Sequence, residues 1–360
     1  MWRKFSVPVS SLLVLSFGFN AQRTARIECL AGCESGPLGG PAVKAKLIEP
    51  FGVAFDNAGS LYVCEYRGHR ITRVSPSGNI SLFAGTGEAG YGGDGGPAAR
   101  ALFNEPHGLA IVDRQMYVAD TRNQRIRKID LKSGTITTIA GTGKAGFSGD
   151  GGPAINAEFN GVFAIAVNKE GNKIYVADLG NRRIRFLDLR SGTIMTVAGN
   201  GAEGVPSDGS DAASSPLVDP RAVALDAKGN LYILERRGDA LRVVGPRGKI
   251  RTLIGPAARD NPPREPKLNG PKHLCADLDD NVIIADSENH LIRKYFPNEG
   301  KTLTIAGTGE KGARLVPQDP VKSQLNRPHG VYVHPSGSLY ISDSDNNRIL
   351  KMTGQFESKR

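Results

Sequence analysis

The chain has 360 residues and a formal net charge of +10 at pH 7, with 46 Lys and Arg against 36 Asp and Glu. Its hydrophobic content of 39% and its 45 glycines suit an all-β protein with tight turns. No stretch reaches the roughly 18 apolar residues that cross a bilayer as a helix, which argues against a helical membrane protein. The basic balance favours anionic partners through long-range attraction.

The N-terminus differs in kind from the rest of the chain. Arg3 and Lys4 precede an apolar, uncharged run over residues 7–19, which is typical of a secretory signal peptide. We therefore predict a signal peptide over residues 1–21 and a secreted or periplasmic mature protein, with an uncleaved N-terminal anchor as the alternative. Outside the cytoplasm such a protein meets other proteins, anionic glycans and cell-wall polymers before nucleic acid, so a nucleic-acid partner is not favoured.

One motif then recurs six times, at a spacing of 51 to 58 residues. Each copy has a short apolar strand that ends in an acid, then an Asn- or Gly-rich turn and a strand rich in Arg and Ile. A Pro eleven or twelve residues before most copies opens an earlier strand, and a fourth strand follows. The six acid-ending strands are 62–65, 117–120, 175–178, 232–235, 283–286 and 340–343. Four short strands at this period predict an all-β fold, a six-bladed β-propeller with four-stranded blades, over residues 22–360.

The last repeat stops before its fourth strand, and the missing strand is found at the other end of the chain. Residues 27–32 match residues 136–141 in position within the repeat. We predict that this N-terminal strand completes the sixth blade and closes the ring, which hides otherwise exposed strand edges. Cys29 and Cys33 lie in and just after this strand, and the glycine between them leaves a disulfide open as a possibility that export would permit.

The repeated residues resemble the NHL repeat. Pro-x-Gly-Val-Ala at residues 50–54, the Leu-Tyr-Val strand that follows, and Asn-x-Arg-Ile at residues 123–126 carry the resemblance, which spans about residues 27–353. The Gly-rich linkers around Asp94 and Asp150 resemble those of exported bacterial NHL-repeat proteins. The resemblance implies a scaffold used for protein interaction, RNA binding or sensing, and in one branch for a metal-dependent lyase, so it does not fix the function.

The repeated charged residues have structural interpretations. In four copies an Arg follows the strand-ending acid by five residues: Glu65/Arg70, Asp120/Arg125, Asp178/Arg183 and Asp343/Arg348. Because an acid and a base across a short turn can pair, we interpret these as blade-stabilising ion pairs. We likewise interpret Asp94 and Asp150 as turn residues that cap a short helix, since one carboxylate per loop is too few for calcium.

The candidate binding residues follow the opening position of each blade and differ between blades: Phe51, His107, Phe163, Arg221, Lys272 and His329. In a propeller the innermost strands line the central channel, so we expect these side chains at its mouth. The sequence therefore predicts a non-catalytic binding or scaffolding module without a cofactor, whose ligand is a protein or an anionic glycan. In this interpretation the histidines line a polar mouth where Arg221 can hold an anion.

The alternative is a metal-dependent lyase or lactonase with its site at the central channel. In the lyase branch, His in a Pro-His context supplies metal ligands from alternate blades, and the equivalent residues here are His107, Arg221 and His329. Zn, Cu or Ca at His107 and His329 would fit this alternative. Two imidazoles fall short of a zinc site, however, and the cationic Arg221 disfavours a bound cation. The sequence leaves the ligand and the oligomeric state open.

Overall fold

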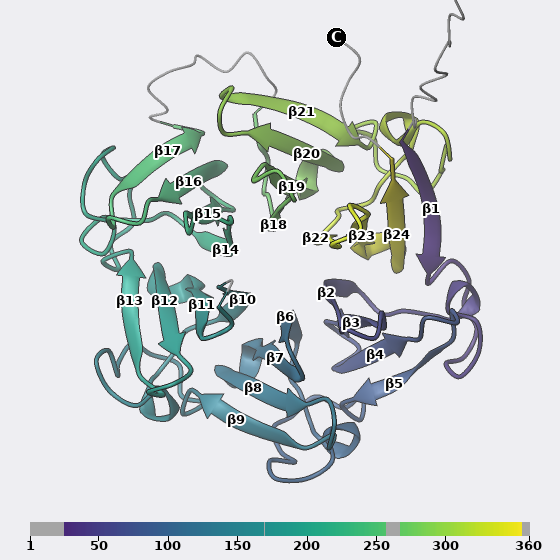
Figure 1. Cartoon of the computed structure of the whole chain (residues 1–360), viewed down its shortest axis with the longest axis horizontal. Coiled ribbons are helices and arrows are strands. Elements are labelled where there is room, and N and C mark those ends of the chain that lie inside the picture. Colours follow the sequence, from purple (N-terminus) through teal and green to yellow (C-terminus); the bar gives the residue numbers. More distant parts are fainter. Residues whose placement is uncertain (1–24, 169, 257–266, 355–360) are drawn as a thin grey trace, which may run out of the picture.

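The computed structural model describes residues 25–168, 170–256 and 267–354. Six four-stranded antiparallel sheets form blades around a central axis (Figure 1). The four strands of each blade lie side by side, in order from the centre of the ring to its rim. The prediction of a six-bladed β-propeller is thereby confirmed. The predicted signal peptide lies outside the described residues.

The strands follow the repeat. The first three blades are β2 (Pro50–Phe55), β3 (Leu61–Glu65), β4 (Arg70–Val74) and β5 (Ile80–Ala84); β6 (Pro106–Val112), β7 (Gln115–Asp120), β8 (Arg125–Asp130) and β9 (Ile136–Ala140); and β10 (Val162–Val167), β11 (Lys173–Asp178), β12 (Arg183–Asp188) and β13 (Ile194–Ala198). The other three are β14 (Pro220–Leu225), β15 (Leu231–Glu235), β16 (Ala240–Val244) and β17 (Ile250–Ile254); β18 (His273–Ala276), β19 (Val282–Asp286), β20 (Leu291–Phe296) and β21 (Lys301–Ala306); and β22 (Gly330–Val333), β23 (Leu339–Asp343), β24 (Arg348–Thr353) and β1 (Arg26–Ala31).

Short 3₁₀ helices occupy turns and linkers between the strands. Four lie in linkers between blades or before the first: η1 (Ala42–Lys44), η2 (Ala98–Arg100), η4 (Ala154–Asn156) and η7 (Pro320–Lys322). Four follow an acid-ending strand: η3 (Thr121–Asn123), η5 (Leu179–Asn181), η6 (Ser287–Asn289) and η8 (Ser344–Asn346).

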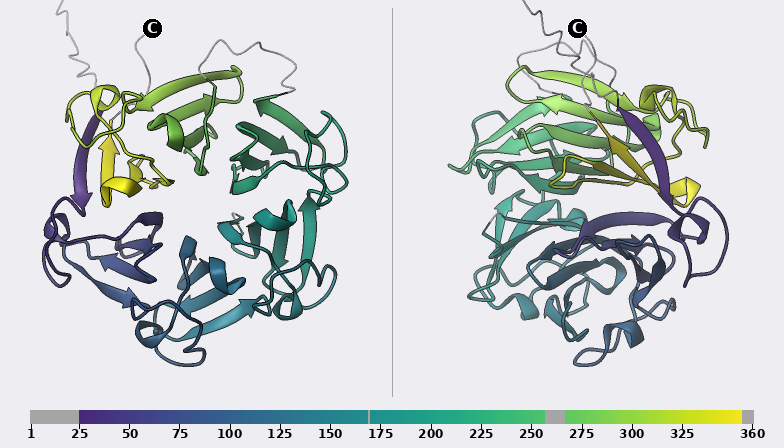
Figure 2. Two further views of the ribbon diagram at one scale, coloured as in Figure 1. Left: turned by 180° about the vertical axis from the view of Figure 1, so that it is seen from behind. Right: turned by 45° about the vertical axis from the view of Figure 1, so that its right-hand side comes forward.

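The N-terminal strand closes the ring as predicted. β1 pairs antiparallel with β24, with Ile27 opposite Met352, and forms the outer edge of the sixth blade (Figure 2). Ile27 is fully buried in this position. Cys29 and Cys33 form a disulfide across the end of the strand, with their Cα atoms 6.2 Å apart. The two ends of the described chain therefore share one sheet.

The acid-ending strands form the core of each blade. All five residues of β3, β15, β19 and β23 are buried, because neighbouring blades cover both faces of the sheet. For the same reason these strands appear in the sequence as continuous apolar runs rather than alternating ones. At the centre the inner strands approach each other closely: a Cβ added at Gly52 would lie 2.9 Å from the carbonyl oxygen of His107.

The Gly-rich linkers shield the outer strand edges. Within the linker before the second blade, the carbonyl of Gly96 accepts a hydrogen bond from the backbone of Ile136 (3.1 Å), and Gly95 donates to the Ile136 carbonyl (2.8 Å). The linker around Asp150 pairs with Ile194 in the same way. Each linker thus occupies backbone groups on the rim strand that would otherwise be open to pairing with another chain.

Candidate functional site

Contacts at one end of the ring join five of the six predicted binding residues. The Phe51 ring stacks on His329, with centroids 4.3 Å apart, and meets the edge of His107 at 4.7 Å. His107 in turn lies 5.3 Å from the ring of Phe163, over which Arg221 is stacked at 3.8 Å. We call Phe51, His107, Phe163, Arg221, Lys272 and His329 the central cluster. All six lie at the starts of the innermost strands or at the residue before them, and these strands surround the central axis (Figure 1).

The members of the central cluster pack against one another at this end of the ring. Five of its members are buried, with exposed fractions from 1% for His107 to 7% for His329. Phe163 is half-buried and is the member that a ligand can reach most directly. The small residues of the inner strands explain this packing, because they let the blades approach until side chains from different blades touch.

Arg221 is the cation at the middle of the cluster. Its Nη2 donates a hydrogen bond to Nε2 of His107, 2.7 Å away and 114 residues distant in the chain. Within the described part of the protein, no acid forms an ion pair with Arg221, and its buried Nε has no hydrogen-bond partner. Burial, reinforced by the nearby charge of Arg236, lowers the pKa of Arg221 to about 9.

Burial disfavours the charged form of the histidines beside Arg221. Burial and then the charge of Arg221 hold the pKa of His107 well below its usual range, and burial and Lys272 do the same for His329. Burial followed by Arg221 lowers the pKa of His273 to about 4. Because His107 accepts from Arg221 at Nε2, its proton lies on Nδ1. Neutral imidazoles cannot balance the charge of the guanidinium.

The aromatic ring of Phe51 lies against both His107 and His329, the two residues predicted as possible metal ligands. The Nε2 lone pair of His107 already accepts from a cation. The described residues contain no group of three or more His, Cys, Asp or Glu side chains placed to hold a metal. Zinc sites in proteins have at least three protein ligands, so the two imidazoles alone fall short of such a site.

Ion pairs surround the central cluster at the same end of the ring. Lys272 Nζ lies 3.2 Å from Glu288, which also pairs with Arg327 at 2.7 Å. Asp219, whose charge is felt by Arg221, is already bound to Arg236 at 2.7 Å. These acids are thus neutralised by other bases, and the charge of Arg221 remains unmatched among them.

The predicted acid–arginine pairs are right in two blades and wrong in two. Glu65–Arg70 (2.9 Å) and Asp343–Arg348 (2.8 Å) form as expected. Asp120, by contrast, binds Arg127 rather than Arg125. Asp178 likewise lies 3.7 Å from Arg185, and the blades without a predicted pair form Glu235–Arg242 and Asp286–Arg293.

The register explains this correction. Asp120 lies directly opposite Arg125, but Arg127 sits two residues along on the same face, and its guanidinium reaches back to the carboxylate. Arg125 instead stacks over the ring of Tyr91 at 3.8 Å. In the first and sixth blades Thr72 and Leu350 stand where Arg127 does, which leaves the acid to the directly opposite Arg.

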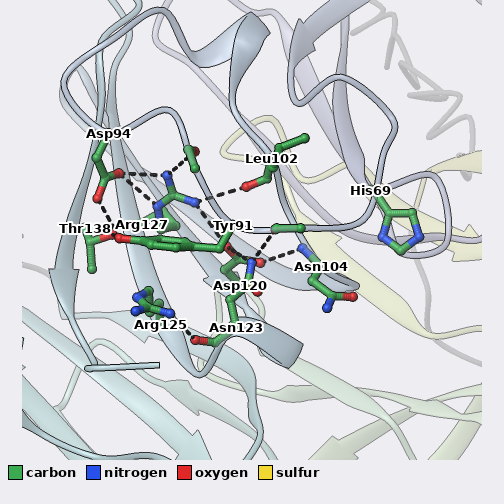
Figure 3. A network of polar contacts seen from close by, with 12 residues as sticks. His69, Tyr91, Asp94, Leu102, Asn104, Asp120, Asn123, Arg125, Arg127 and Thr138 are labelled. Atoms are coloured by element: carbon green, nitrogen blue, oxygen red, sulfur yellow. Dashed lines mark hydrogen bonds and ion pairs between the residues drawn. The ribbon is translucent and has the colours of Figure 1, made fainter. Parts of the chain in front are cut away.

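Asp94 has a different role from the predicted helix cap. Its carboxylate accepts from Arg127 at 2.7 Å and from the hydroxyl of Tyr91, so that Arg127 lies between Asp94 and Asp120 (Figure 3). The helix that follows it has no side-chain cap. Asp150 binds Arg185 in the next blade in the same way. Both linker acids therefore anchor the linker to a buried arginine.

Sequence reasoning missed a set of links between blades. His69 and His290 have left-handed backbones, and each Nδ1 accepts a hydrogen bond (3.1 Å) from the backbone N–H preceding the next blade, at Glu105 and Arg327 respectively. Three other blades use an acceptor at the same position, namely Gln124, Asp239 and Asn347. The signal was present in the sequence, because this position before the Arg or its equivalent carries a hydrogen-bond acceptor in five repeats.

Comparisons with known proteins agree with this architecture. The profile of the NHL repeat matches residues 103–129 and 325–352. NHL repeat-containing protein 2 of Gallus gallus is 28% identical over 341 residues, covering 84% of this chain and 46% of that protein; Teneurin-3 of Danio rerio is 28% identical, covering 86% and 12% respectively. The chain is a six-bladed β-propeller in which two segments match the NHL repeat. It spans less than half the length of these curated relatives.

Solved structures share the fold at low sequence identity. An auxiliary nutrient binding protein from Bacteroides ovatus has a TM-score of 0.67 at 16% identity, covering 93% of this chain and 78% of that one. A streptogramin B lyase has a TM-score of 0.54 at 14% identity, covering 92% and 98%. These similarities show a common fold. Among the described residues, no helix is long and apolar enough to cross a membrane.

Proposed function

We propose that this protein is an exported, non-catalytic binding module that takes up its ligand or partner at the central cluster. One observation carries the proposal. Two phenylalanines, two histidines, one arginine and one lysine occupy equivalent positions of the six blades at one end of the ring, on a frame whose repeated charged residues pair with each other. Aromatic rings beside a cation suit recognition of a protein or an anionic glycan.

Two proteins of the same fold support a binding role. Two structures with this fold are described as auxiliary nutrient binding proteins of Bacteroides, with TM-scores of 0.65 and 0.67. The buried acids of the motif also have structural partners in every blade, which leaves none of them as a distinct catalytic carboxylate. The metal-dependent lyase alternative shares the fold, but the packing around His107 and His329 gives it no donor set.

The test compares two phenylalanines of the third blade region. Phe163→Ala removes the half-buried member of the central cluster, whereas Phe147→Ala removes an exposed ring on the outer linker. A glycan array and a pull-down with the mature protein first identify a partner. We expect Phe163→Ala to weaken that binding at least about tenfold, the scale of a buried aromatic contact, while Phe147→Ala leaves it unchanged. Equal binding by both variants and the wild type, with unchanged circular dichroism, would show that the partner binds elsewhere.

A further inference from the structure

The central cluster contains a buried positive charge that the surrounding protein does not balance. Arg221 is 5% exposed, and its single hydrogen bond within the described chain goes to the Nε2 atom of His107. A guanidinium has five N–H donors and stays charged near neutral pH, so several donors remain for another group. A buried charge without a partner is costly, which makes an external counter-ion the expected resolution.

The neighbouring charges strengthen this imbalance. Burial, followed by the charge of Arg221, lowers the pKa of Lys272 in the next blade, and Lys272 is itself paired with Glu288 at 3.2 Å. The acids nearest to them, Asp219 and Glu288, are bound by Arg236 and by Lys272 with Arg327. A group that enters the centre therefore meets a positive field with unused N–H donors.

The protein uses only part of the hydrogen-bonding capacity of the Arg221 guanidinium. Nη2 is directed at His107 and one face of the group is covered by Phe163, while Nε is unpartnered. An anion that bridges Nε and a terminal nitrogen forms two parallel hydrogen bonds, the strongest mode of arginine recognition. Phe163, which stacks on the guanidinium of Arg221, is the half-buried member of the central cluster.

We propose that the central cluster recognises a carboxylate or phosphate group of its ligand, held by the guanidinium of Arg221 with Lys272 as a second cation. This inference rests on the proposed function and adds the chemical class of the ligand. A uronic-acid sugar and a phosphorylated molecule share this chemistry. His107 positions Arg221 by accepting from Nη2, and the aromatic rings of Phe51 and Phe163 exclude water from the pair.

The experiment measures thermal unfolding with defined probes. The mature protein is melted in sodium glucuronate, in sodium phosphate, in glucose, and in potassium chloride of matched ionic strength. We expect one of the two anions to raise the melting temperature by about 2 °C or more at saturating concentration, and glucose and chloride to have no such effect. The anion that acts identifies the source as a carboxylated sugar or a phosphate.

Two variants decide whether Arg221 is responsible. Arg221→Gln keeps an amide donor for His107 and removes the charge, so it should melt at or above the wild type without the anion and show no shift with it. Arg190→Gln removes the same charge from an exposed turn and should keep the full shift. The proposal is wrong if Arg221→Gln retains the anion-dependent shift, or if neither anion shifts the wild type.

The outcome for the proposed function is separate. If neither anion acts but Phe163→Ala still weakens the identified partner, the centre binds a neutral group; the anion inference then fails and the binding module remains. If Phe163→Ala has no effect either, both proposals fail.

Discussion

Buried arginines occur in two regions of this propeller, and they are in opposite situations. Within the blades, Arg127, Arg185, Arg242 and Arg293 are at most 1% exposed, and each lies within ion-pair distance of a carboxylate. At the centre, Arg221 is almost as buried but contacts an imidazole and a phenyl ring. The arginines within the blades are thus each balanced by a carboxylate, whereas Arg221 at the centre forms no ion pair among the described residues.

This difference between the paired arginines of the blades and Arg221 distinguishes a structural role from a binding role, although the ligand is unknown. A charge that recurs with its partner in several blades stabilises the blade, because repetition gives no reason for a distinct chemistry. A charge that occurs in one blade and lacks a partner leaves interaction energy unused in the free protein. Such unused interactions are what a binding site offers to its ligand.

The largest effect should come from opening the ring. A chain that starts at Lys46 lacks β1, so β24 loses its outer partner and the pocket of the fully buried Ile27 is emptied. The Ile27 side chain alone contributes about 1.5–3 kcal/mol, a large share of a marginal free energy of folding. We expect this chain to be insoluble or to melt at least about 10 °C lower than one that starts at Arg23. Equal melting temperatures in calorimetry would contradict closure by β1.

A smaller effect should distinguish the two kinds of arginine directly. Arg127→Met leaves the buried carboxylate of Asp120 without its cation, which should cost about 3–5 kcal/mol in the free energy of unfolding. Arg221→Gln removes an unbalanced charge and should change stability by less than about 1 kcal/mol. Urea unfolding measures both, and Arg125→Gln, at a half-buried site without an acid partner, is the control. A large loss for Arg221→Gln would mean that this arginine belongs to the frame.

The fold could be predicted because the number and the spacing of the repeats indicate how many blades the propeller has. Six acid-ending strands fix the number of blades, and the absence of a fourth strand after Arg348 indicates where residues 27–32 must go. The ion-pair partners could be predicted only in part. A cross-strand pattern identifies the residue opposite an acid, but a long arginine can reach the acid from two positions along, as Arg127 does.

The position of each residue on its inner strand predicted which residues form the central cluster. It did not predict how these residues pack against one another. Whether the channel mouth is open depends on contacts between blades that are distant in sequence, such as Phe51 with His329 and Arg221 with His107. No local pattern encodes these contacts. The role of His69 and His290 was missed for the same reason, since each acts on the backbone of the next blade.

The smallest predicted effect concerns His69 and His290. Their hydrogen bonds join neighbouring blades, and their imidazole rings can gain a proton as the pH falls. Each Nδ1 must be unprotonated to accept its backbone hydrogen bond, and burial lowers the pKa of both below the usual 6.5. Glu105 opposes the shift at His69; at His290 Glu288 and Asp343 oppose it, whereas Lys311 and Arg327 add to it. Since the unfolded chain binds these protons more readily, their contribution to stability is complete above pH 6.5 and is lost as the pH falls through the folded pKa.

Replacing both histidines with Asn isolates that contribution. Asn accepts through its amide oxygen at the equivalent Asn347, so the double variant His69→Asn/His290→Asn keeps an acceptor that does not titrate. The buried Asp120 and Asp178, whose pKa burial raises to about 6, gain protons in the folded state as the pH falls and so act in the opposite direction. They are present in both proteins, and their effect therefore cancels in the comparison. We expect the urea midpoint of the wild type to fall relative to the double variant between pH 7.5 and pH 5. Parallel midpoints over this range would show that the histidine links between blades do not depend on protonation.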